Sequence, residues 1–204
     1  LCHKLVPSTS KEKFHLLAMI SGIPNVGKST LINAVAGRKV AKTGDEPAIT
    51  KGLQKIRVRD DVVFLDTPGI LWPKIHNENS GYRLSAAGSI KDTATDIQDI
   101  AFYLADYLIS HYPNNLASRY DLKTIPPTEI EFLELMGAAR GCLGAGGRVN
   151  LEKASTLLVN EFRAGLLGKI SLETPDQVLA EELVVAKQKK EKEERDAARK
   201  ARRR

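Results

Sequence analysis

The chain has 204 residues, of which 42% are hydrophobic, 27% charged and 5% aromatic. These fractions are typical of soluble globular proteins and exclude collagen-like, mucin-like and wholly disordered chains, so one domain or two small ones are expected. The sequence contains no apolar run long enough for a membrane span, and its first fifteen residues do not follow the pattern of a signal peptide. The isolated Cys2 and Cys142 lack metal-ligand spacing and indicate reduced thiols. We therefore expect a cytoplasmic protein that binds no membrane.

The formal net charge of +6 is concentrated near the C-terminus. From Glu181 onward the chain has ten Lys or Arg residues and six Asp or Glu residues. After Val185 this tail has almost no apolar face, which predicts a solvated helix or a disordered segment. A second interpretation is an arm that binds nucleic acid, because clustered cations release counterions from a phosphate backbone. The sequence leaves both interpretations open.

The first part of the chain has the pattern of an α/β nucleotide-binding fold. An apolar strand ends at Gly22, a helix follows the glycine-rich turn and ends at Gly37, and two further strands come next. We assign residues 1–81 to this α/β domain. The expected strands cover residues 16–21, 54–59 and 62–65, and the expected helix covers residues 31–36.

The second part of the chain has three helix signals. Thr95 and Gln98 form a capping box before the first helix, Pro126 and Pro127 open the second, and Asn150 caps the third. Each signal precedes apolar residues at helical spacing. We predict a small all-α domain over residues 82–175 and a charged basic tail over residues 176–204.

The segment from Gly22 to Ser29 matches the P-loop pattern and lies between a predicted strand and a predicted helix. Its glycines allow backbone N–H groups to surround a phosphate, Lys28 supplies a positive charge to the β- and γ-phosphates, and the Ser29 hydroxyl ligates Mg²⁺. The residues predicted to bind nucleotide are Gly22, Pro24, Asn25, Val26, Gly27, Lys28, Ser29, Thr30 and Gly69.

A second motif follows the strand at residues 62–65. Asp66 is expected to hold the Mg²⁺ shell, and the N–H of Gly69 is expected to reach the γ-phosphate. In the intervening loop, Thr50 is the predicted switch residue whose hydroxyl reaches Mg²⁺ when the γ-phosphate is present, with Thr43 as the alternative. The predicted catalytic residues are therefore Lys28 and Thr50, and the predicted metal ligands are Ser29, Thr50 and Asp66.

Five segments of this sequence resemble the ribosome biogenesis GTPase A family of circularly permuted P-loop GTPases. They are GIPNVGKSTLIN, GDEPAITK, DTPGILWPK, RGCLGAGGRVNLEKA and EFRAGLLGKISLE, and the resemblance covers residues 2–175. It implies GTP and Mg²⁺ as ligands, K⁺ at Asn25, slow hydrolysis stimulated by the ribosomal particle, and a helical domain that contacts ribosomal RNA of the large-subunit precursor. We expect the RNA contacts at Arg140, Arg148, Arg163 and Lys169, and we expect a monomer.

The sequence departs from this family in two places, at Ala48 and in its missing guanine-reading motif, and at Ile70 it differs from many regulatory GTPases. Ala48 replaces a glycine of the switch motif, and Ile70 replaces the glutamine that orients water in many regulatory GTPases. We expect packing to fix Ile70, with His76 the nearest titratable residue and the water-positioning group outside this chain. No Asn-Lys-x-Asp or Thr-Lys-x-Asp motif, which reads guanine, occurs in the 204 residues. In the permuted family this motif precedes the P-loop, so we expect it upstream of a truncated chain.

These observations predict a partial, circularly permuted, GTPase-type parallel sheet followed by a small all-α domain. With upstream strands missing, the sheet edge beside residues 16–21 is expected to be unpaired. The predicted function is a GTP-hydrolysing assembly factor of the large ribosomal subunit that switches on the pre-ribosome. The main alternative is an RNA-binding module with a non-catalytic P-loop remnant, and a P-loop ATPase is a third hypothesis.

Overall fold

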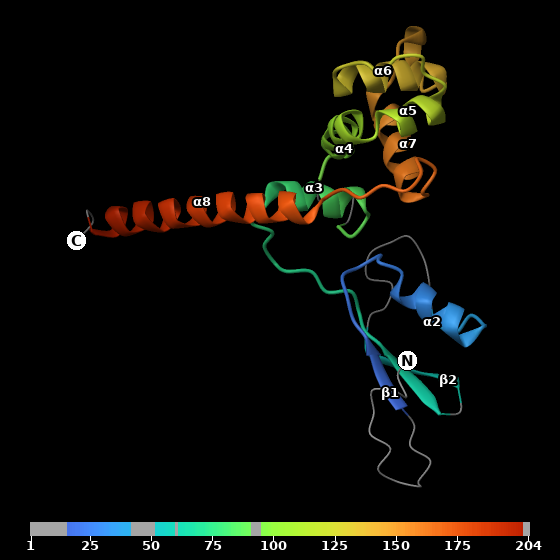
Figure 1. The fold of residues 1–204 in the computed structure, drawn as a ribbon, viewed down its shortest axis with the longest axis vertical. Coiled ribbons are helices and arrows are strands. Elements are labelled where there is room, and N and C mark those ends of the chain that lie inside the picture. Colours follow the sequence, from blue (N-terminus) through green and yellow to red (C-terminus); the bar gives the residue numbers. More distant parts are fainter. Residues whose placement is uncertain (1–15, 42–51, 60, 91–94, 202–204) are drawn as a thin grey trace. The chain divides into compact units, whose positions relative to one another are not determined.

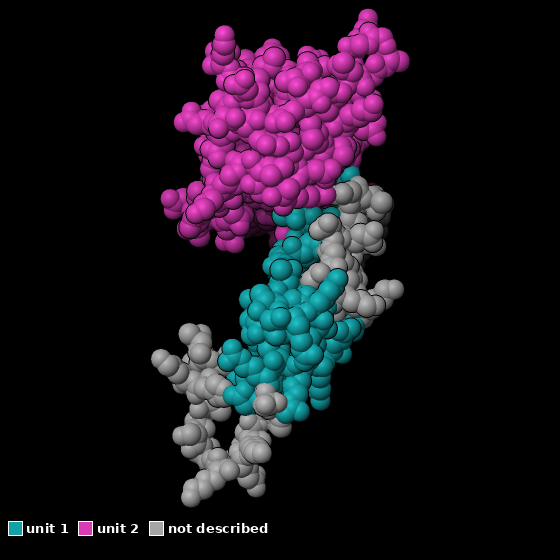
Figure 2. Space-filling view, turned by 90° about the vertical axis from the view of Figure 1, so that its right-hand side faces the viewer, with its two compact units in different colours: residues 1–72, 87–95 teal, residues 73–86, 96–204 magenta. Residues whose placement is uncertain are grey.

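A computed structural model describes residues 16–41, 52–59, 61–90 and 95–201 of the chain (Figure 1). The chain forms two compact units (Figure 2). Unit 1 comprises Leu1–Trp72 and Ala87–Thr95, and unit 2 comprises Pro73–Ala86 and Asp96–Arg204. The chain thus leaves unit 1, returns to it for one short segment and leaves it again. The domain boundaries expected at residues 81 and 175 stay a prediction.

Unit 1 contains a three-stranded sheet of order β1-β3-β2. Strands β1 (Leu16–Ile20) and β3 (Val62–Asp66) are parallel, with Leu16 opposite Val62 and Ile20 opposite Asp66. Strand β2 (Gln54–Arg59) pairs antiparallel with β3, because the two residues that join them are too few for a crossover connection. The α/β fold is confirmed, and the sheet is mixed where the sequence predicted a parallel one.

Helix α2 (Lys28–Ala36) follows β1 and is bounded by two glycines in the left-handed region, Gly27 with φ 84° and Gly37 with φ 65°. The apolar core that it covers is small. Among the described residues its buried members are Ile32, Ala41, Ile56 and Phe64. Strand β1 lies at an edge of the sheet, as expected, and exposes 58% of Leu17 and 64% of Met19.

Unit 2 is helical. Helices α4 (Ile97–His111), α6 (Glu129–Ala139) and α7 (Leu151–Arg163) confirm the three predicted helices. Helices α3 (Glu78–Ala86) and α5 (Pro113–Tyr120) and the short 3₁₀ turn η2 (Ala145–Gly147) were not predicted. The tail forms helix α8 (Pro175–Ala201), so the solvated-helix interpretation of its conformation is correct.

The helix caps explain why these elements begin where they do. Asn150 accepts a hydrogen bond from Lys153 N and caps α7 as predicted. Thr128 caps α6, two residues after the proline pair begins. The cap of α4 is Asp96, whose carboxylate accepts from Gln98 N, and not Thr95. Asp96 lies one residue after Thr95, has an extended backbone conformation and provides the N-cap in its place.

Unit 2 has one continuous apolar core, built mainly by α4, α6 and α7. Its largest fully buried side chains include Leu104, Phe132 and Leu158. An ion pair lies beside it, where Nη2 of the half-buried Arg119 contacts Oε1 of the buried Glu161 at 2.7 Å. The guanidinium holds the pKa of Glu161 below its ordinary value, mainly by hydrogen bonding. Within the described residues, no helix has both the length and the hydrophobicity that a membrane crossing requires.

Candidate nucleotide-binding site

The loop between β1 and α2 has the backbone geometry of a phosphate cradle. Asn25 has φ 58° and Gly27 has φ 84°, both in the left-handed region. Asparagine and glycine are the residues that adopt this region at least cost. Gly27 is also the N-cap of α2, so the loop ends at the N-terminus of a helix. The backbone N–H groups that such a loop offers and the positive end of the helix dipole together favour an anion at this position.

Lys28 and Ser29 begin α2 and face the loop and the sheet. Lys28 Nζ donates to the carbonyl oxygens of Gly22 at 3.2 Å and Ile23 at 2.7 Å, so the ammonium lies at the mouth of the loop. The Ser29 hydroxyl donates to Asp66 Oδ2 at 3.2 Å. Asp66 is the last residue of β3 and only 1% exposed. The structure therefore brings together the predicted phosphate-binding lysine and two of the predicted metal ligands.

Gly69 packs directly against the loop. A Cβ atom built on Gly69 would lie 2.6 Å from both the N and Cα atoms of Pro24, which is too close for any side chain. The N–H of Ile70 donates to Gly22 O at 3.4 Å, and the Thr67 hydroxyl donates to Ile20 O at 2.8 Å. The predicted γ-phosphate loop is thereby held against the end of β1 and the first half of the phosphate cradle.

A third segment contacts the loop, and sequence reasoning missed it. After α3 the chain returns to unit 1, where the buried Ser89 hydroxyl donates to Pro24 O at 2.9 Å. In the opposite direction, Asn25 Nδ2 donates to Gly88 O at 2.7 Å. This reciprocal pair stabilises the left-handed conformation of Asn25. No motif in the sequence marks Gly88 and Ser89, because their role depends on the return of the chain to unit 1.

The remaining predicted residues are either outside the described part of the chain or exposed. Thr50 and Thr43 lie outside the described residues. Val26 and Thr30 are in place, one in the loop and one in the first turn of α2, and both are exposed. Ile70 is 72% exposed, so the expectation that packing fixes its position is wrong. His76 is exposed as well.

The four cations predicted to contact RNA fall into two groups. Arg163 is half-buried and donates to Ser85 O at 2.7 Å and Ala86 O at 3.0 Å, where it satisfies the last carbonyls of α3. The expectation that Arg163 lies on an exposed side is therefore wrong. Arg140, Arg148 and Lys169 are exposed.

The geometry by itself defines a class of site. A glycine-bounded loop, a lysine at a helix N-terminus and a hydroxyl paired with a buried carboxylate form a P-loop site for a nucleoside triphosphate. The donor set fits Mg²⁺, which takes one or two protein oxygens and completes its shell with phosphates and water. In the described part of the chain, no cluster of three or more His, Cys, Asp or Glu residues suggests a different metal site.

Comparison with known proteins agrees with this class. Residues 17–130 match the family of 50S ribosome-binding GTPases. Ribosome biogenesis GTPase A of Priestia megaterium is 48% identical over 167 residues, which cover 82% of this chain and 58% of that protein. Mitochondrial ribosome-associated GTPase 1 of Ictalurus punctatus is 37% identical, with 76% and 54% covered. The chain belongs to the family of 50S ribosome-binding GTPases.

Solved structures support the same assignment. A GDP-bound structure of YlqF is similar with a TM-score of 0.54 and 28% identity, over 81% of this chain and 63% of that one. GNP-bound YlqF from T. maritima gives a TM-score of 0.51 and 30% identity, over 78% and 59%. The chain thus spans little more than half the length of the curated relatives named above.

Proposed function

We propose that this chain is the phosphate-binding and RNA-contacting part of a GTP-hydrolysing factor that assembles the large ribosomal subunit. The single observation that carries the proposal is the pairing of Ser29 with the buried Asp66 beside Lys28. Few other functions require a hydroxyl, a desolvated carboxylate and an ammonium at the head of one helix. The family membership supplies the ribosomal context.

In the proposed reaction the protein positions the triphosphate and stabilises the charge that develops on it. Lys28 Nζ now donates to two neutral carbonyls and would exchange them for charged β- and γ-phosphate oxygens, which accept stronger hydrogen bonds. The Gly69 N–H would donate to the γ-phosphate. Water attacks the γ-phosphorus in line with the leaving oxygen, and GDP and phosphate are released.

Mg²⁺ would be held by Ser29 Oγ and Asp66, directly or through water, and would neutralise charge on the β- and γ-phosphates. Thr50 is the proposed third contact. K⁺ is proposed at Asn25, as in the family that the sequence resembles. Because Asn25 Nδ2 donates to Gly88 O, a cation there must be contacted by Oδ1.

The attacking water needs a group that can accept its hydrogen bond, which the apolar Ile70 cannot do. We propose that this group comes from outside the chain, in line with stimulation by the ribosomal particle. The proposed partners are the large-subunit precursor and its ribosomal RNA, with Arg140, Arg148 and Lys169 as contacts. We propose further that the protein acts in the cytoplasm as a monomer and switches on the pre-ribosome between its GTP-loaded and released states.

The metal roles give the sharpest test of the site. Ser29→Ala and Asp66→Ala should each weaken binding of a GTP analogue, and part of the loss should return as the Mg²⁺ concentration rises. Asp61→Ala is the control, since Asp61 precedes β3 and is exposed. Isothermal titration at several Mg²⁺ concentrations measures the effect. Losses that do not respond to Mg²⁺ in either variant would show that the metal roles are wrong.

A second candidate function is an RNA-binding module whose P-loop no longer binds nucleotide. The basic C-terminal tail favours it, together with the absence of a guanine-reading motif from the sequence. For the same reason we expect the chain to discriminate weakly between GTP and ATP. Saturable binding of both triphosphates would support the proposed function, whereas RNA binding with no triphosphate binding would support the module.

A further inference from the structure

Helix α8 and the three residues after it consist of three segments that differ in charge. The root, residues 175–186, has three acidic residues and no basic ones. The spacer, residues 187–198, has five basic and four acidic residues. The tip, residues 199–204, has five basic residues and no acidic ones, and its last three residues lie beyond the described part of the chain. The excess positive charge of the tail is therefore concentrated at its end.

The start of the root is fixed by a capping box. Gln177 N donates to the Thr174 hydroxyl at 3.3 Å, and Thr174 N donates to Gln177 Oε1 at 2.9 Å. Pro175 occupies the first helical position, where its missing N–H costs nothing. Just before it, Tyr107 and Tyr112 both donate to Ser171 O. The chain therefore enters α8 along a defined path.

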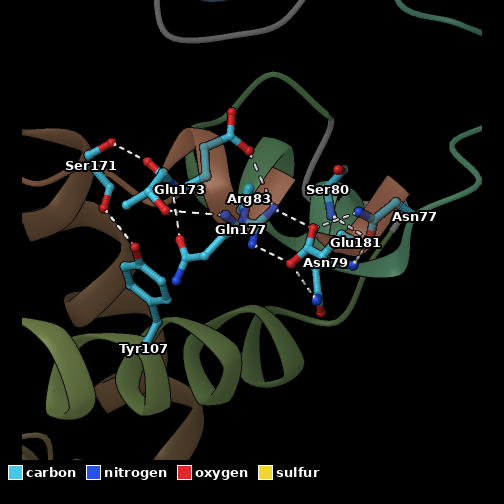
Figure 3. A network of polar contacts seen from close by, with 10 residues as sticks. Asn77, Asn79, Ser80, Arg83, Tyr107, Ser171, Glu173, Gln177 and Glu181 are labelled. Carbon is cyan, nitrogen blue, oxygen red and sulfur yellow. Dashed lines mark hydrogen bonds and ion pairs between the residues drawn. The ribbon is translucent and has the colours of Figure 1, made fainter. Parts of the chain in front are cut away.

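One turn later, Glu181 ties the root to α3 (Figure 3). Its carboxylate accepts from both terminal nitrogens of the buried Arg83, at 2.7 and 2.8 Å, and from Asn77 and Asn79 at 2.6 and 2.9 Å. Arg83 also contacts Glu173 at 3.3 Å. A bidentate guanidinium pair restricts orientation as well as distance. This contact sets the direction in which α8 leaves the other helices of unit 2.

From Lys187 to Asp196, the described side chains of the spacer do not pack on the rest of unit 2. All its side chains from Lys187 to Asp196 are exposed. A helix that is polar on every side is stable alone only with many interactions between neighbouring turns. Opposite charges four residues apart have the spacing that such interactions require. These pairs are Lys187 with Glu191, Lys189 with Glu193, Lys190 with Glu194, Glu191 with Arg195, and Lys192 with Asp196.

We propose that α8 is a directed arm that carries its basic tip to the phosphate backbone of RNA. Helical rise places Arg199 about 27 Å along the axis from Glu181, and Figure 1 shows α8 continuing well beyond α3. This inference rests on the proposed function only for the statement that the RNA is ribosomal. A tip without acidic residues matches a polyanion, whose counterions it would release.

The position of the apolar residues distinguishes RNA from a membrane as the partner. A helix that lies on a membrane needs apolar and basic faces side by side along its length. In α8 the exposed Leu179, Leu183 and Val184 all lie in the root, before the first basic residue. The spacer and tip have no apolar residue larger than alanine. The basic part therefore has no apolar face to insert.

The test compares two variants with equal loss of charge. The tip variant changes Arg199, Lys200, Arg202 and Arg203 to Gln, and the control changes the exposed Arg38, Lys39, Lys55 and Lys123 to Gln. Affinity for an RNA duplex of arbitrary sequence is measured between low and moderate salt. We expect the tip variant to bind at least tenfold more weakly at low salt and its log-log salt slope to fall by about 3. The control should lose less than threefold.

Three results would overturn the proposal. These are an unchanged salt slope in the tip variant, an equal loss in the control, and tighter binding of the chain to phosphatidylglycerol vesicles than to RNA. Triphosphate binding is measured on the same samples and should be the same in the tip variant and the unmodified chain. Loss of RNA binding with intact triphosphate binding separates the arm from the P-loop. A chain that binds RNA through its tip but never hydrolyses GTP would refute the proposed function and leave the arm supported.

Discussion

Each of the two compact units is stabilised internally by a different kind of interaction. Among the described residues, unit 2 buries sixteen apolar residues in one cluster, whereas the cluster of unit 1 has only four. Burial of apolar surface is the main stabilising contribution in folding, and in the described part of the chain unit 2 has much more of this burial. The phosphate loop of unit 1 is fixed instead by the polar contacts of Asn25 and Ser89 and by the packing of Gly69 on Pro24.

This difference predicts which property a substitution in each unit should change. In unit 1 a polar contact defines the shape of a binding loop, so its loss should change affinity for nucleotide more than stability. In unit 2 a polar contact lies on a well-packed helical body, so its loss should change stability and leave nucleotide binding unaltered. Substitutions in either unit can therefore test one side of this contrast.

The largest effect is expected at Lys28. Lys28→Ala removes the only charge that the described loop offers to phosphate oxygens, so GTP turnover should fall at least a hundredfold. Lys39→Ala, at an exposed lysine just beyond α2, is the control. Single-turnover hydrolysis of radiolabelled GTP measures both. Equal turnover in the two variants would refute the assignment of the loop.

Gly69→Ala should have the next largest effect. The new Cβ would lie 2.6 Å from two backbone atoms of Pro24, so the loop must move. Nucleotide affinity should fall by about thirtyfold, an overpacking effect of about 2 kcal/mol. Gly52→Ala is the matched control, since a Cβ atom added to Gly52 would meet nothing within 4 Å. If both variants bind alike, the close packing of Gly69 on Pro24 is not required.

Glu181→Gln tests unit 2. It removes a charged partner of the buried Arg83 and should lower the free energy of unfolding by about 2 kcal/mol, with nucleotide affinity unaltered. Glu182→Gln is the control, because it makes the same change of charge at an exposed position. Chemical denaturation monitored by circular dichroism compares them. Equal stabilities would show that the contact with Arg83 contributes nothing.

The same glutamate predicts an acid transition. Hydrogen bonds from Arg83, followed by those from Asn77 and Asn79, lower the pKa of Glu181 from its ordinary 4.5 to about 2. Because the pKa is lower in the folded state, this contribution is complete above pH 4.5 and disappears as the pH falls toward 2. The difference in stability between the chain and Glu181→Gln should therefore shrink over this window. A difference that stays constant would contradict the assigned shift.

The smallest effect is expected at Ser89. Ser89→Ala leaves the Pro24 carbonyl without its hydroxyl donor and should weaken binding of GTP and GDP equally, by about tenfold. Ser85→Ala is the control, because Ser85 is buried to a similar extent but belongs to unit 2. Hydrogen exchange of residues 22–30 should rise only in Ser89→Ala. Unchanged exchange would show that Ser89 does not hold the loop.

Much of this molecule could be predicted from its sequence where the signals are local. The glycine spacing around Lys28 predicted the loop, and the cap at Asn150 and the left-handed stop at Gly37 predicted helix boundaries. Ser29 and Asp66 were also predicted to share one metal site, because one motif follows the first strand and the other follows a later strand of the same sheet. The hydrogen bond between them agrees with this prediction. These inferences need only the short-range geometry of helices and strands.

Other features depend on contacts distant in sequence and could not be predicted. Ser89 contacts Pro24 across 65 residues, and no local pattern announces that return. Arg163 resembled a surface cation because sequence spacing does not reveal the carbonyls of α3 that it satisfies. Helix α3 was missed because its sequence, ENSGYRLSA, is polar and contains a glycine. Tertiary contacts, including those of Arg83, stabilise it instead.

The proposed function depends first on binding of a triphosphate through Lys28 and the loop before it. Trp72 is the only tryptophan, lies three residues after Gly69 and is 71% exposed, so its fluorescence reports on this region. The direct measurement is a fluorescence titration of the chain and of Lys28→Ala with Mg²⁺ and GTPγS. We predict a saturable change in the chain and at least a hundredfold weaker binding by Lys28→Ala. Equal binding by the two proteins, or no binding by either, would contradict triphosphate binding through Lys28.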